Sequence, residues 1–324
     1  MADCLSKLDC NPVFISATGN DSLADGVLQY CNHIDMLSVP TLNNVSTATY
    51  CPVLLASGQL LFGVGNMDIN THFSLNKVSD LDAMIKSAPL VVLDSNFTSE
   101  VIESVVFKCV DMSVPVWFEP TDLLKSTKPF ETDAWKHLTF ISPNLGELVL
   151  MYRALMRKHD QQCNEIDVSE ENTRLEDILE IIVQMCVSMV AYIPIILVTL
   201  GKHGILLCHN FGDVSHLLPL PIVTNLQFKA TYYRAFDCHE SLSKIVSVSG
   251  AGDCFASAFI AGMLQGLHLD LCVKQGLLAA SLSLQSTSAV PATITTNNIL
   301  KAGTSNTFFK WQSIDVSSGH SDLL

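Results

Sequence analysis

The sequence predicts an α/β fold whose central sheet is covered by helices on both faces. From Asn76 onward, apolar runs of four to five residues alternate with stretches long enough to form helices. The runs are apolar throughout rather than at every second position, which is typical of strands buried on both faces. Charged residues make up only 15% of the chain, against about 25% in an average soluble domain. A large buried core is therefore possible, and disorder of the whole chain is excluded.

Four of the apolar runs are expected to be parallel strands, at residues 90–93, 114–118, 138–142 and 195–199. The segments around them are expected to be helical crossovers, because parallel neighbours need connections of this length. These segments are 98–110, the region after Thr121, 145–159 and 169–190. Two further apolar helices are expected from Asp253 to about Leu267 and from Leu271 to about Ser286.

Residues 181–200 are the stretch that resembles a membrane span, since about twenty apolar residues can cross a bilayer. We interpret it as two elements. Ser169 can cap a helix whose first turn carries Glu170 and Glu171, and Pro194 marks a break before a β-branched run. A helix that leads into a buried strand therefore explains the stretch better than a membrane span.

The cysteine pattern and the net charge indicate which cellular compartment and which classes of binding partner to expect. The 11 cysteines are odd in number and scattered, with no C-x-x-C pair, which favours reduced thiols. The first ten residues lack the pattern of a secretory signal, so a cytoplasmic protein is expected. With Lys+Arg 18 and Asp+Glu 32, the net charge of −14 argues against nucleic acid or membrane partners. One small anion can still bind at a helix start.

Residues 47–68 differ from the rest, because they predict a hairpin of two strands joined at Ser57 and Gly58. A hairpin attached to a parallel-sheet protein is often a lid over a ligand. A β-meander at the sheet edge, with no ligand role, explains this segment equally well.

The residues most informative about chemistry are S-G-A-G-D-C-F at 249–255, which precede an apolar helix. Gly250 and Gly252 allow a sharp turn and close approach of a ligand, and the helix directs free N–H groups to the same place. Asp253 in the first turn can accept a proton from a hydroxyl beside such an anion pocket. That combination suits phosphoryl transfer to an alcohol. On spacing alone, a glycine turn followed by an Asp that only caps the helix is the favoured explanation, because the motif is short and common.

Three motifs in one order resemble the ribokinase-like (PfkB) carbohydrate and nucleoside kinases. They are G-A-G-D at 250–253, P-N-L-G-E-L at 143–148 and V-T-L-G-K-H-G at 198–204. The resemblance implies a three-layer αβα sandwich with a mainly parallel sheet and a small β lid. It places a kinase domain at residues 1–302, with the lid hairpin at about 47–68, and a loose tail at 303–324.

Within that family, the resemblance is strongest to the pseudouridine kinases. It rests on P-V-F-I-S-A-T-G-N-D at 12–21, T-A-T-Y at 47–50, G-N-M-D at 65–68 and V-V-L-D-S-N at 91–96. It implies transfer of phosphate from ATP, with Mg²⁺, to the 5′-hydroxyl of pseudouridine. Another ribose, nucleoside or sugar acceptor is the alternative within the class, and a homodimer through the lid is a possible assembly.

The resemblance also assigns the reacting groups. Asp253 is the expected general base, and the backbone of Gly250, Ala251 and Gly252 is the expected anion hole. Asn144 and Glu147 are expected near the ATP phosphates, with Glu147 the residue near magnesium, which prefers oxygen ligands. A helix-capping Asn and a solvated Glu are the alternative for that pair.

The remaining assignments concern the nucleotide and the acceptor. The nucleotide turn is expected at Thr199, Gly201 and Gly204, with an ordinary strand-to-strand turn as the alternative. The helix carrying Ala280 and Ser283 is expected beside the adenine. The polar residues expected on the acceptor side, each equally explained by a solvated surface, are Thr49, Asp68, Asp94, Asn96 and Lys125.

Two departures from the family pattern weaken the inference that this chain is catalytically active. The family's first strand and its G-G-x-x-x-N segment have no counterpart, so the first strand of the sheet is expected to be missing and the chain to be N-terminally truncated. Ser247 replaces the Asp or Asn of many relatives, which weakens the inference of a monovalent-cation site. A binding or regulatory protein that has lost catalysis is therefore the competing hypothesis.

Overall fold

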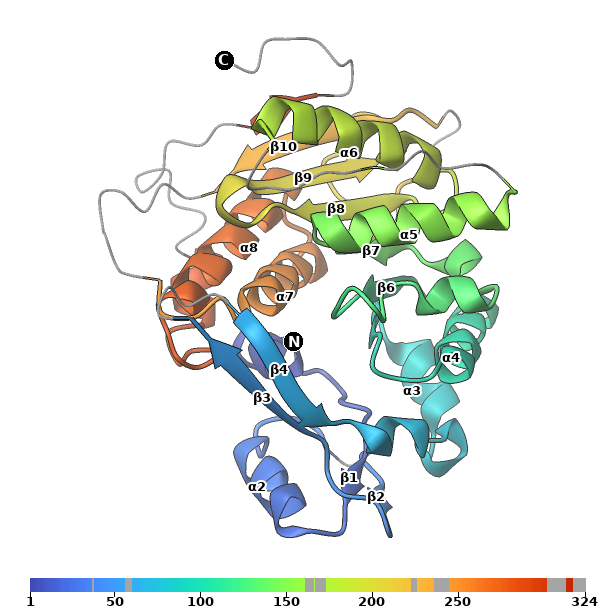
Figure 1. Cartoon of the computed structure of the whole chain (residues 1–324), viewed down its shortest axis with the longest axis vertical. Coiled ribbons are helices and arrows are strands. Elements are labelled where there is room, and N and C mark those ends of the chain that lie inside the picture. Colours follow the sequence, from blue (N-terminus) through green and yellow to red (C-terminus); the bar gives the residue numbers. More distant parts are fainter. Residues whose placement is uncertain are drawn as a thin grey trace. The chain divides into compact units, whose positions relative to one another are not determined.

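The computed structural model describes residues 1–36, 38–55, 60–160, 166, 173–222, 226–235, 245–301 and 313–316. The chain forms two compact units, whose elements are labelled in Figure 1. Unit 1 consists of Met1–Leu81, Ser215–Leu220 and Phe236–Phe309. Unit 2 consists of Asp82–Val214, Pro221–Ala235 and Lys310–Leu324.

A seven-stranded sheet forms the centre of unit 2, in the order β11-β10-β9-β8-β7-β6-β5. The four strands that the sequence predicts pair in parallel, as expected: β5 Val91–Asp94, β6 Val116–Glu119, β7 Phe140–Ile141 and β8 Ile195–Thr199. The sheet then continues with antiparallel pairs to β9 Gly204–His209, β10 Lys229–Arg234 and β11 Ser313–Asp315. Only the connection from β8 to β9 is short, and a connection that short joins antiparallel neighbours.

Helices α4 Ser99–Asp111, α5 Leu145–Lys158 and α6 Leu175–Met189 match predicted helical segments. Helix α3 Leu81–Ser87 has no counterpart in the prediction. The prediction of a helical crossover after Thr121 is wrong, because this region forms no α-helix. It contains two 3₁₀ turns, η3 Lys128–Glu131 and η4 Ala134–His137, and Pro129 lies near the start of η3. The cap expected at Ser169 lies outside the described residues.

Residues 181–200 are a helix followed by a buried strand, as expected. Helix α6 ends at Met189, and every residue of β8 except Thr199 is buried. Helix α5 contacts β8, and α6 contacts β9. No helix in the described part of the chain is both long and apolar enough to cross a bilayer.

The core of unit 2 is built on its central strands. Trp117 and Phe118 of β6 and Phe140 of β7 have no exposed surface. The rings of Trp117 and Phe140 stack with centroids 5.2 Å apart. Because a strand buried on both faces directs alternate side chains to opposite sides, Trp117 and Phe118 fill the core on different faces of the sheet.

Unit 1 contains two small sheets and four α-helices among its described residues. Strands β1 Thr18–Gly19 and β2 Thr41–Leu42 pair in parallel, and β3 Thr49–Leu54 pairs antiparallel with β4 Leu60–Asn66. The helices are α1 Ala2–Lys7, α2 Ser22–Tyr30, α7 Ala251–Leu264 and α8 Leu269–Leu284. Shorter turns are η1 Asp68–Thr71, η2 Leu75–Lys77 and the π-helical η7 Asn297–Lys301.

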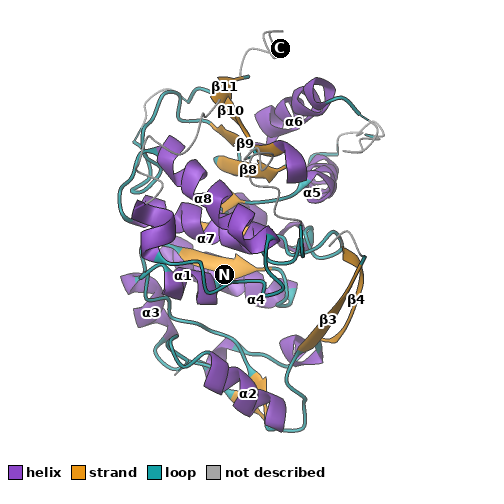
Figure 2. Ribbon diagram, turned by 90° about the vertical axis from the view of Figure 1, so that its left-hand side faces the viewer, coloured by secondary structure: helices purple, strands orange, loops and turns teal. Residues whose placement is uncertain are grey.

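The hairpin expected within residues 47–68 is confirmed by β3 and β4, which lie side by side in Figure 2. Its expected turn at Ser57 and Gly58 lies outside the described residues. The ring of Tyr50 lies against Gly63 on the opposite strand, where an added Cβ would come within 2.4 Å of the ring carbons. Glycine at this position therefore makes room for the aromatic ring.

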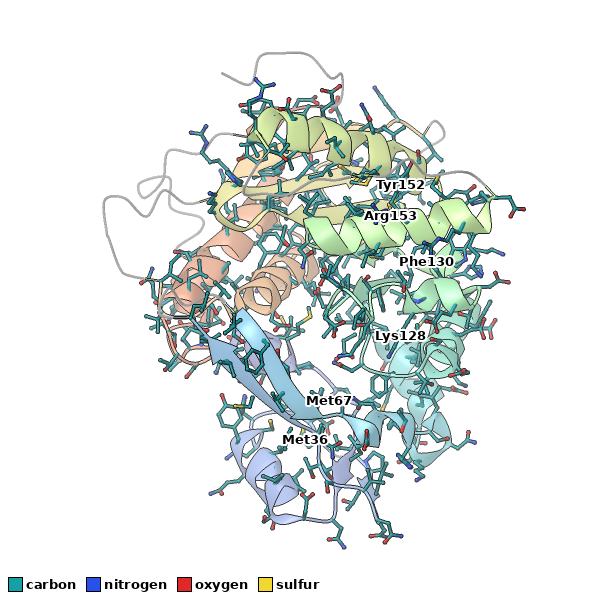
Figure 3. The ribbon with its side chains drawn as sticks, in the orientation of Figure 1. Met36, Met67, Lys128, Phe130, Tyr152 and Arg153 are labelled. Atoms are coloured by element: carbon teal, nitrogen blue, oxygen red, sulfur yellow. The ribbon has the colours of Figure 1, made fainter. Side chains whose placement is uncertain are left out.

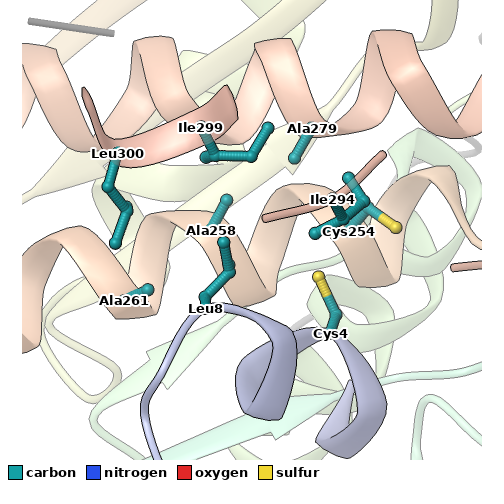
Figure 4. Packing of buried hydrophobic residues seen from close by; sticks show 9 residues of the cluster. All are labelled: Cys4, Leu8, Cys254, Ala258, Ala261, Ala279, Ile294, Ile299 and Leu300. Atoms are coloured by element: carbon teal, nitrogen blue, oxygen red, sulfur yellow. The ribbon is translucent and has the colours of Figure 1, made fainter. Parts of the chain in front are cut away.

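Two connected helix contacts form the core of unit 1. Helices α7 and α8 pack closely because small residues face bulky ones, as where a Cβ on Gly276 would meet the ring of Phe255 at 2.7 Å. Helix α1 packs on α7 through a buried cluster that includes Cys4, Leu8, Cys254 and Ala258 (Figure 4). The cysteines that the structure describes are all free thiols.

Leu8→Ala tests the contact between α1 and α7. Leu8 has no exposed surface, so its truncation is expected to lower the free energy of unfolding by about 3 kcal/mol through lost burial and a cavity. Leu124→Ala is the matched control, because Leu124 is 90% exposed and should change stability by less than about 0.5 kcal/mol. Urea unfolding measures both. Equal effects of the two substitutions would contradict the packing described here.

Candidate active site

The sequence-predicted residues of unit 2 lie where its parallel strands end. Asp94 ends β5, Asn144 follows β7 and Thr199 ends β8. The carboxyl ends of parallel strands share one edge of a sheet, which is where open α/β sheets bind ligands. The structure therefore brings these residues to one side of the unit.

Asn144 and Glu147 form a capping box at the start of α5. Asn144 Oδ1 accepts a hydrogen bond from the backbone N–H of Glu147, and Glu147 Oε2 accepts one from that of Asn144, both at 2.9 Å. The helix-capping interpretation of Asn144 is therefore correct for its oxygen. The solvated interpretation of Glu147 is wrong, because the residue is only 5% exposed. Burial raises the pKa of its carboxyl, and the nearby charge of Asp122 acts in the same direction.

Thr199 lies beside Asn144. The two residues are partners in a parallel bridge, and the N–H of Thr199 donates to the carbonyl of Pro143 at 2.9 Å. Gly201 and Gly204 follow with φ of 50° and 106°. A Cβ on Gly204 would lie 2.1 Å from the carbonyl oxygen of Tyr233. This glycine is thus needed by the turn between β8 and β9 itself, whatever else the turn binds.

Asp94, Asn96 and Lys125 are brought together, as their assignment to one site requires. Asp94 Oδ1 accepts from the backbone N–H of Asn96 at 2.8 Å, and Lys125 Nζ donates to Asn96 Oδ1 at 3.1 Å. Lys125 Nζ also lies 2.7 Å from Asp122 Oδ2. A partly buried cation and two polar side chains therefore face one another at the end of β5.

Two neighbours of this cluster escaped the sequence analysis. Glu119 is the register partner of Asp94, and its carboxylate accepts a hydrogen bond from the hydroxyl of Ser142. Ser142 in turn accepts from Trp117 Nε1 at 2.7 Å. The signal was present, because Glu119 ends an apolar run just as Asp94 does. The second neighbour is Lys128, which does not end an apolar run and so has no comparable sequence signal.

In unit 1, the predicted anion-binding turn has the expected backbone. Gly250 caps α7 in the left-handed conformation at φ 85°, and its added Cβ would lie 2.3 Å from the carbonyl oxygen of Ala289. An added Cβ on Gly252 meets nothing within 4 Å. Asp253, in the first turn, has a side chain that is 46% exposed, and its Oδ1 lies 3.7 Å from the α-amino group of Met1.

Cys254 and Ser283 belong to the packing beneath that turn. The Cys254 thiol and the Ser283 hydroxyl both donate to the carbonyl of Ala289, at 3.3 and 3.0 Å. A hydrogen bond from the Cys4 thiol lowers the pKa of Cys254, although burial acts against it. Both side chains are buried, so Ser283 supports the loop at Ala289. Ala280, one turn earlier on α8, is half-buried.

Thr49 and Asp68 lie near the same end of the hairpin. Thr49 is the partner of Asn66, whose backbone N–H lies 3.4 Å from Thr49 Oγ1. The backbone N–H of Asp68 donates to Asn66 Oδ1 at 3.0 Å. Both candidate side chains are exposed, so either can reach a ligand.

The described residues contain no group of three or more His, Cys, Asp or Glu side chains that could hold a metal ion. Magnesium in phosphate-transfer sites takes most of its ligands from phosphates and water, with one or two carboxylates from the protein. Glu147 and its neighbour Asp122 fit that more limited role.

The chain is similar to known proteins in both sequence and structure. Residues 235–296, which contain the glycine turn and Asp253, match the pfkB family carbohydrate kinases. In this segment the chain is similar to the PfkB family. Over 313 residues it is 26% identical to a pseudouridine kinase of Arabidopsis thaliana, covering 90% of this chain and 82% of that protein. It is 24% identical to a pseudouridine-metabolizing bifunctional protein of Schizosaccharomyces pombe, of which it spans 42%. These findings support a kinase of the sugar and nucleoside class.

Solved structures show the ribokinase-like fold. A ribokinase of Arabidopsis thaliana, complexed with ribose and ATP, superposes with a TM-score of 0.71 at 20% identity, covering 94% of this chain and 85% of that one. A ribokinase of Cryptococcus neoformans in complex with ADP gives a TM-score of 0.69 at 17% identity, covering 93% and 86%. The αβα architecture expected from the motifs is thereby confirmed.

The two glycines of the G-A-G-D motif should respond differently to alanine. Gly250→Ala is expected to lower the free energy of unfolding by at least about 1 kcal/mol, because it adds strain at positive φ and a clash with Ala289. Gly252→Ala should leave stability equal or raise it by up to about 1 kcal/mol, since alanine favours helix and has room. Urea unfolding of both variants measures this, and an equal loss in the two would contradict the geometry.

Glu147→Gln tests the buried carboxyl. A raised pKa in the folded state stabilises the protein below the ordinary value near pH 4.5 and loses that contribution as the pH rises through the folded pKa. The amide can still accept from the N–H of Asn144 but does not ionise. The stability of the variant relative to wild type should therefore increase between pH 4 and pH 7, measured by urea unfolding. A difference that stays constant with pH would refute this assignment.

Proposed function

We propose that the chain transfers the γ-phosphoryl group of ATP to the 5′-hydroxyl of pseudouridine, giving pseudouridine 5′-phosphate and ADP. The observation that carries the proposal is the turn at 250–253, where glycine backbone, a helix start and a half-exposed carboxylate occur together. The acceptor is inferred from the two relatives named for pseudouridine.

The first part of the reaction is removal of a proton. Asp253 is the proposed general base, and its exposure leaves the carboxylate open to a hydroxyl. As the acceptor oxygen forms its bond to the γ-phosphorus, the bond from phosphorus to the bridging oxygen of ADP breaks. The proton of the hydroxyl passes to Asp253.

The second part is stabilisation of negative charge. The backbone of Gly250, Ala251 and Gly252 is the proposed anion hole, although the N–H of Ala251 also donates to the carbonyl of Val248 at 3.4 Å. Free N–H groups at a helix start and the helix dipole favour an anion. Helix α7 is 14 residues long and buried along most of its length, so its start is held rigidly. Charge stabilisation by preorganised N–H groups is a large part of phosphoryl transfer.

Unit 2 supplies the residues proposed for the nucleotide and for magnesium. Asn144, Thr199 and the turn at Gly201 and Gly204 are proposed to contact ATP. In unit 1, Ala280 is the proposed residue for the adenine, whereas Ser283 is buried and donates to the carbonyl of Ala289, so it supports the loop rather than the ligand. Magnesium, when bound, bridges phosphates and neutralises their charge. Glu147 is the proposed protein group nearest to it. Because Glu147 is buried with a raised pKa, we expect it to act through water or through the position of Asn144.

In unit 2, Asp94, Asn96 and Lys125 are the residues proposed for the acceptor. In unit 1, the polar candidates for the acceptor are Thr49 and Asp68. One face of the hairpin carries Phe62 and Val64, which are 52% and 62% exposed and lie two residues apart on one strand. An apolar face beside polar residues suits a lid over a nucleobase. A contact with a second copy of the chain is the other use of that face.

Purified protein incubated with magnesium-ATP and a panel of acceptors tests the proposal. The panel contains pseudouridine, uridine, ribose and fructose, and ADP release and phosphorylated product are both measured. Pseudouridine is expected to be the preferred acceptor. Product from ribose but not from pseudouridine would overturn the acceptor, and ATP binding without any product would favour a binding protein.

Asp253→Asn should abolish transfer while leaving ATP binding within about threefold, because the variant loses the base but keeps the helix start. Asp270→Asn is the matched control, since Asp270 occupies the first turn of the neighbouring helix α8 and should retain wild-type turnover. Calorimetric titration with ATP and steady-state assays measure the two effects. Normal turnover by Asp253→Asn would show that another group removes the proton.

A further inference from the structure

Lys128 of η3 binds the backbone of the loop that follows β5. Its Nζ donates to the carbonyl of Ser95 at 2.8 Å and to that of Phe97 at 2.6 Å. The residue is half-buried in unit 2, where Figure 3 labels it. The ammonium group thus binds one backbone carbonyl on each side of Asn96, which restricts the position of that residue.

The position of this charge is unfavourable for the adjacent helix. Phe97 directly precedes Thr98, which caps α4, and a cation near a helix start opposes the helix dipole. Burial and the neighbouring charge of Lys125 both lower the pKa of Lys128, while Glu131, Asp122 and Asp94 act in the opposite direction. Stabilising α4 therefore does not explain a lysine here, whereas binding the loop carbonyls does.

The same loop is also held from its other side. Ser95 is fully buried, and its hydroxyl donates to the carbonyl of Pro120. Its backbone N–H lies 3.4 Å from Thr121 Oγ1. The loop is thus bonded to the end of β6 and to η3, and the side chain it presents between these bonds is Asn96, which accepts from Lys125.

We propose that Lys128 is a positioning residue for the acceptor: by binding the carbonyls of Ser95 and Phe97 it sets the direction of Asn96 and of the Asp94 carboxylate bonded to it. The inference rests on the proposed function, because it takes Asn96 and Asp94 as acceptor contacts. Lys128 itself touches neither ATP nor the acceptor. Its effect should therefore appear in acceptor affinity and little in the chemical step.

Lys128→Met removes the two hydrogen bonds and keeps much of the aliphatic stem. The KM for pseudouridine is expected to rise about tenfold, because a small displacement of binding groups is costly. The KM for ATP and kcat should change less than threefold. Lys128→Arg should restore at least half of the loss in KM, since a guanidinium can donate to both carbonyls. Lys136→Met is the matched control, because Lys136 pairs with Asp133 on the surface of the same connection and should behave as wild type.

Hydrogen exchange gives a readout that needs no turnover. The amides of residues 95–97 should exchange at least tenfold faster in Lys128→Met than in wild type and in Lys136→Met. Unchanged exchange, or faster exchange with an unchanged KM for pseudouridine, would overturn the positioning role. A lower kcat together with higher KM values for both ATP and pseudouridine, and a lower melting temperature, would also overturn it in favour of a general structural role. A wild type that phosphorylates no acceptor would overturn the proposed function, while the exchange result would still decide whether Lys128 holds the loop.

Discussion

The parallel register of β5, β6, β7 and β8 is the constraint on which the candidate site of unit 2 depends. Asp94 pairs with Glu119, and the bridge between Asn144 and Thr199 continues the alignment past β7. A slip of one residue in any strand would turn the side chain at its end to the opposite face. The buried rings of Trp117 and Phe140 oppose such a slip, because they would lose their stacking contact with each other.

Local sequence signals are sufficient to predict most elements of this chain. Uninterrupted apolar runs predict β5 to β8, and the helical segments predicted at 98–110 and 145–159 match α4 and α5 closely. The positive φ of Gly250 also follows from local chemistry, since only glycine adopts it without strain. In each case the deciding interaction joins residues close in the sequence.

Other features depend on residues far apart in the sequence, and these could not be predicted. Glu147 looks like a surface residue of a helix, and only the packing around α5 buries it. Lys128 has no local pattern at all, because its partners lie 31 and 33 residues earlier. The roles of Asp253 and of the acceptor residues came from resemblance to a family, since short glycine motifs are too common to be decisive alone.

The connection between β6 and β7 has a consequence for how acceptor preference can change. Between Glu119 and Phe140 the chain forms 3₁₀ turns rather than a full crossover helix. Asp122, Lys125 and Lys128 all lie on this stretch, and none of them belongs to the sheet ladder. If this stretch contacts the acceptor as proposed, natural variation or directed evolution can remodel it to admit a different sugar or base while the strands that align the site are retained.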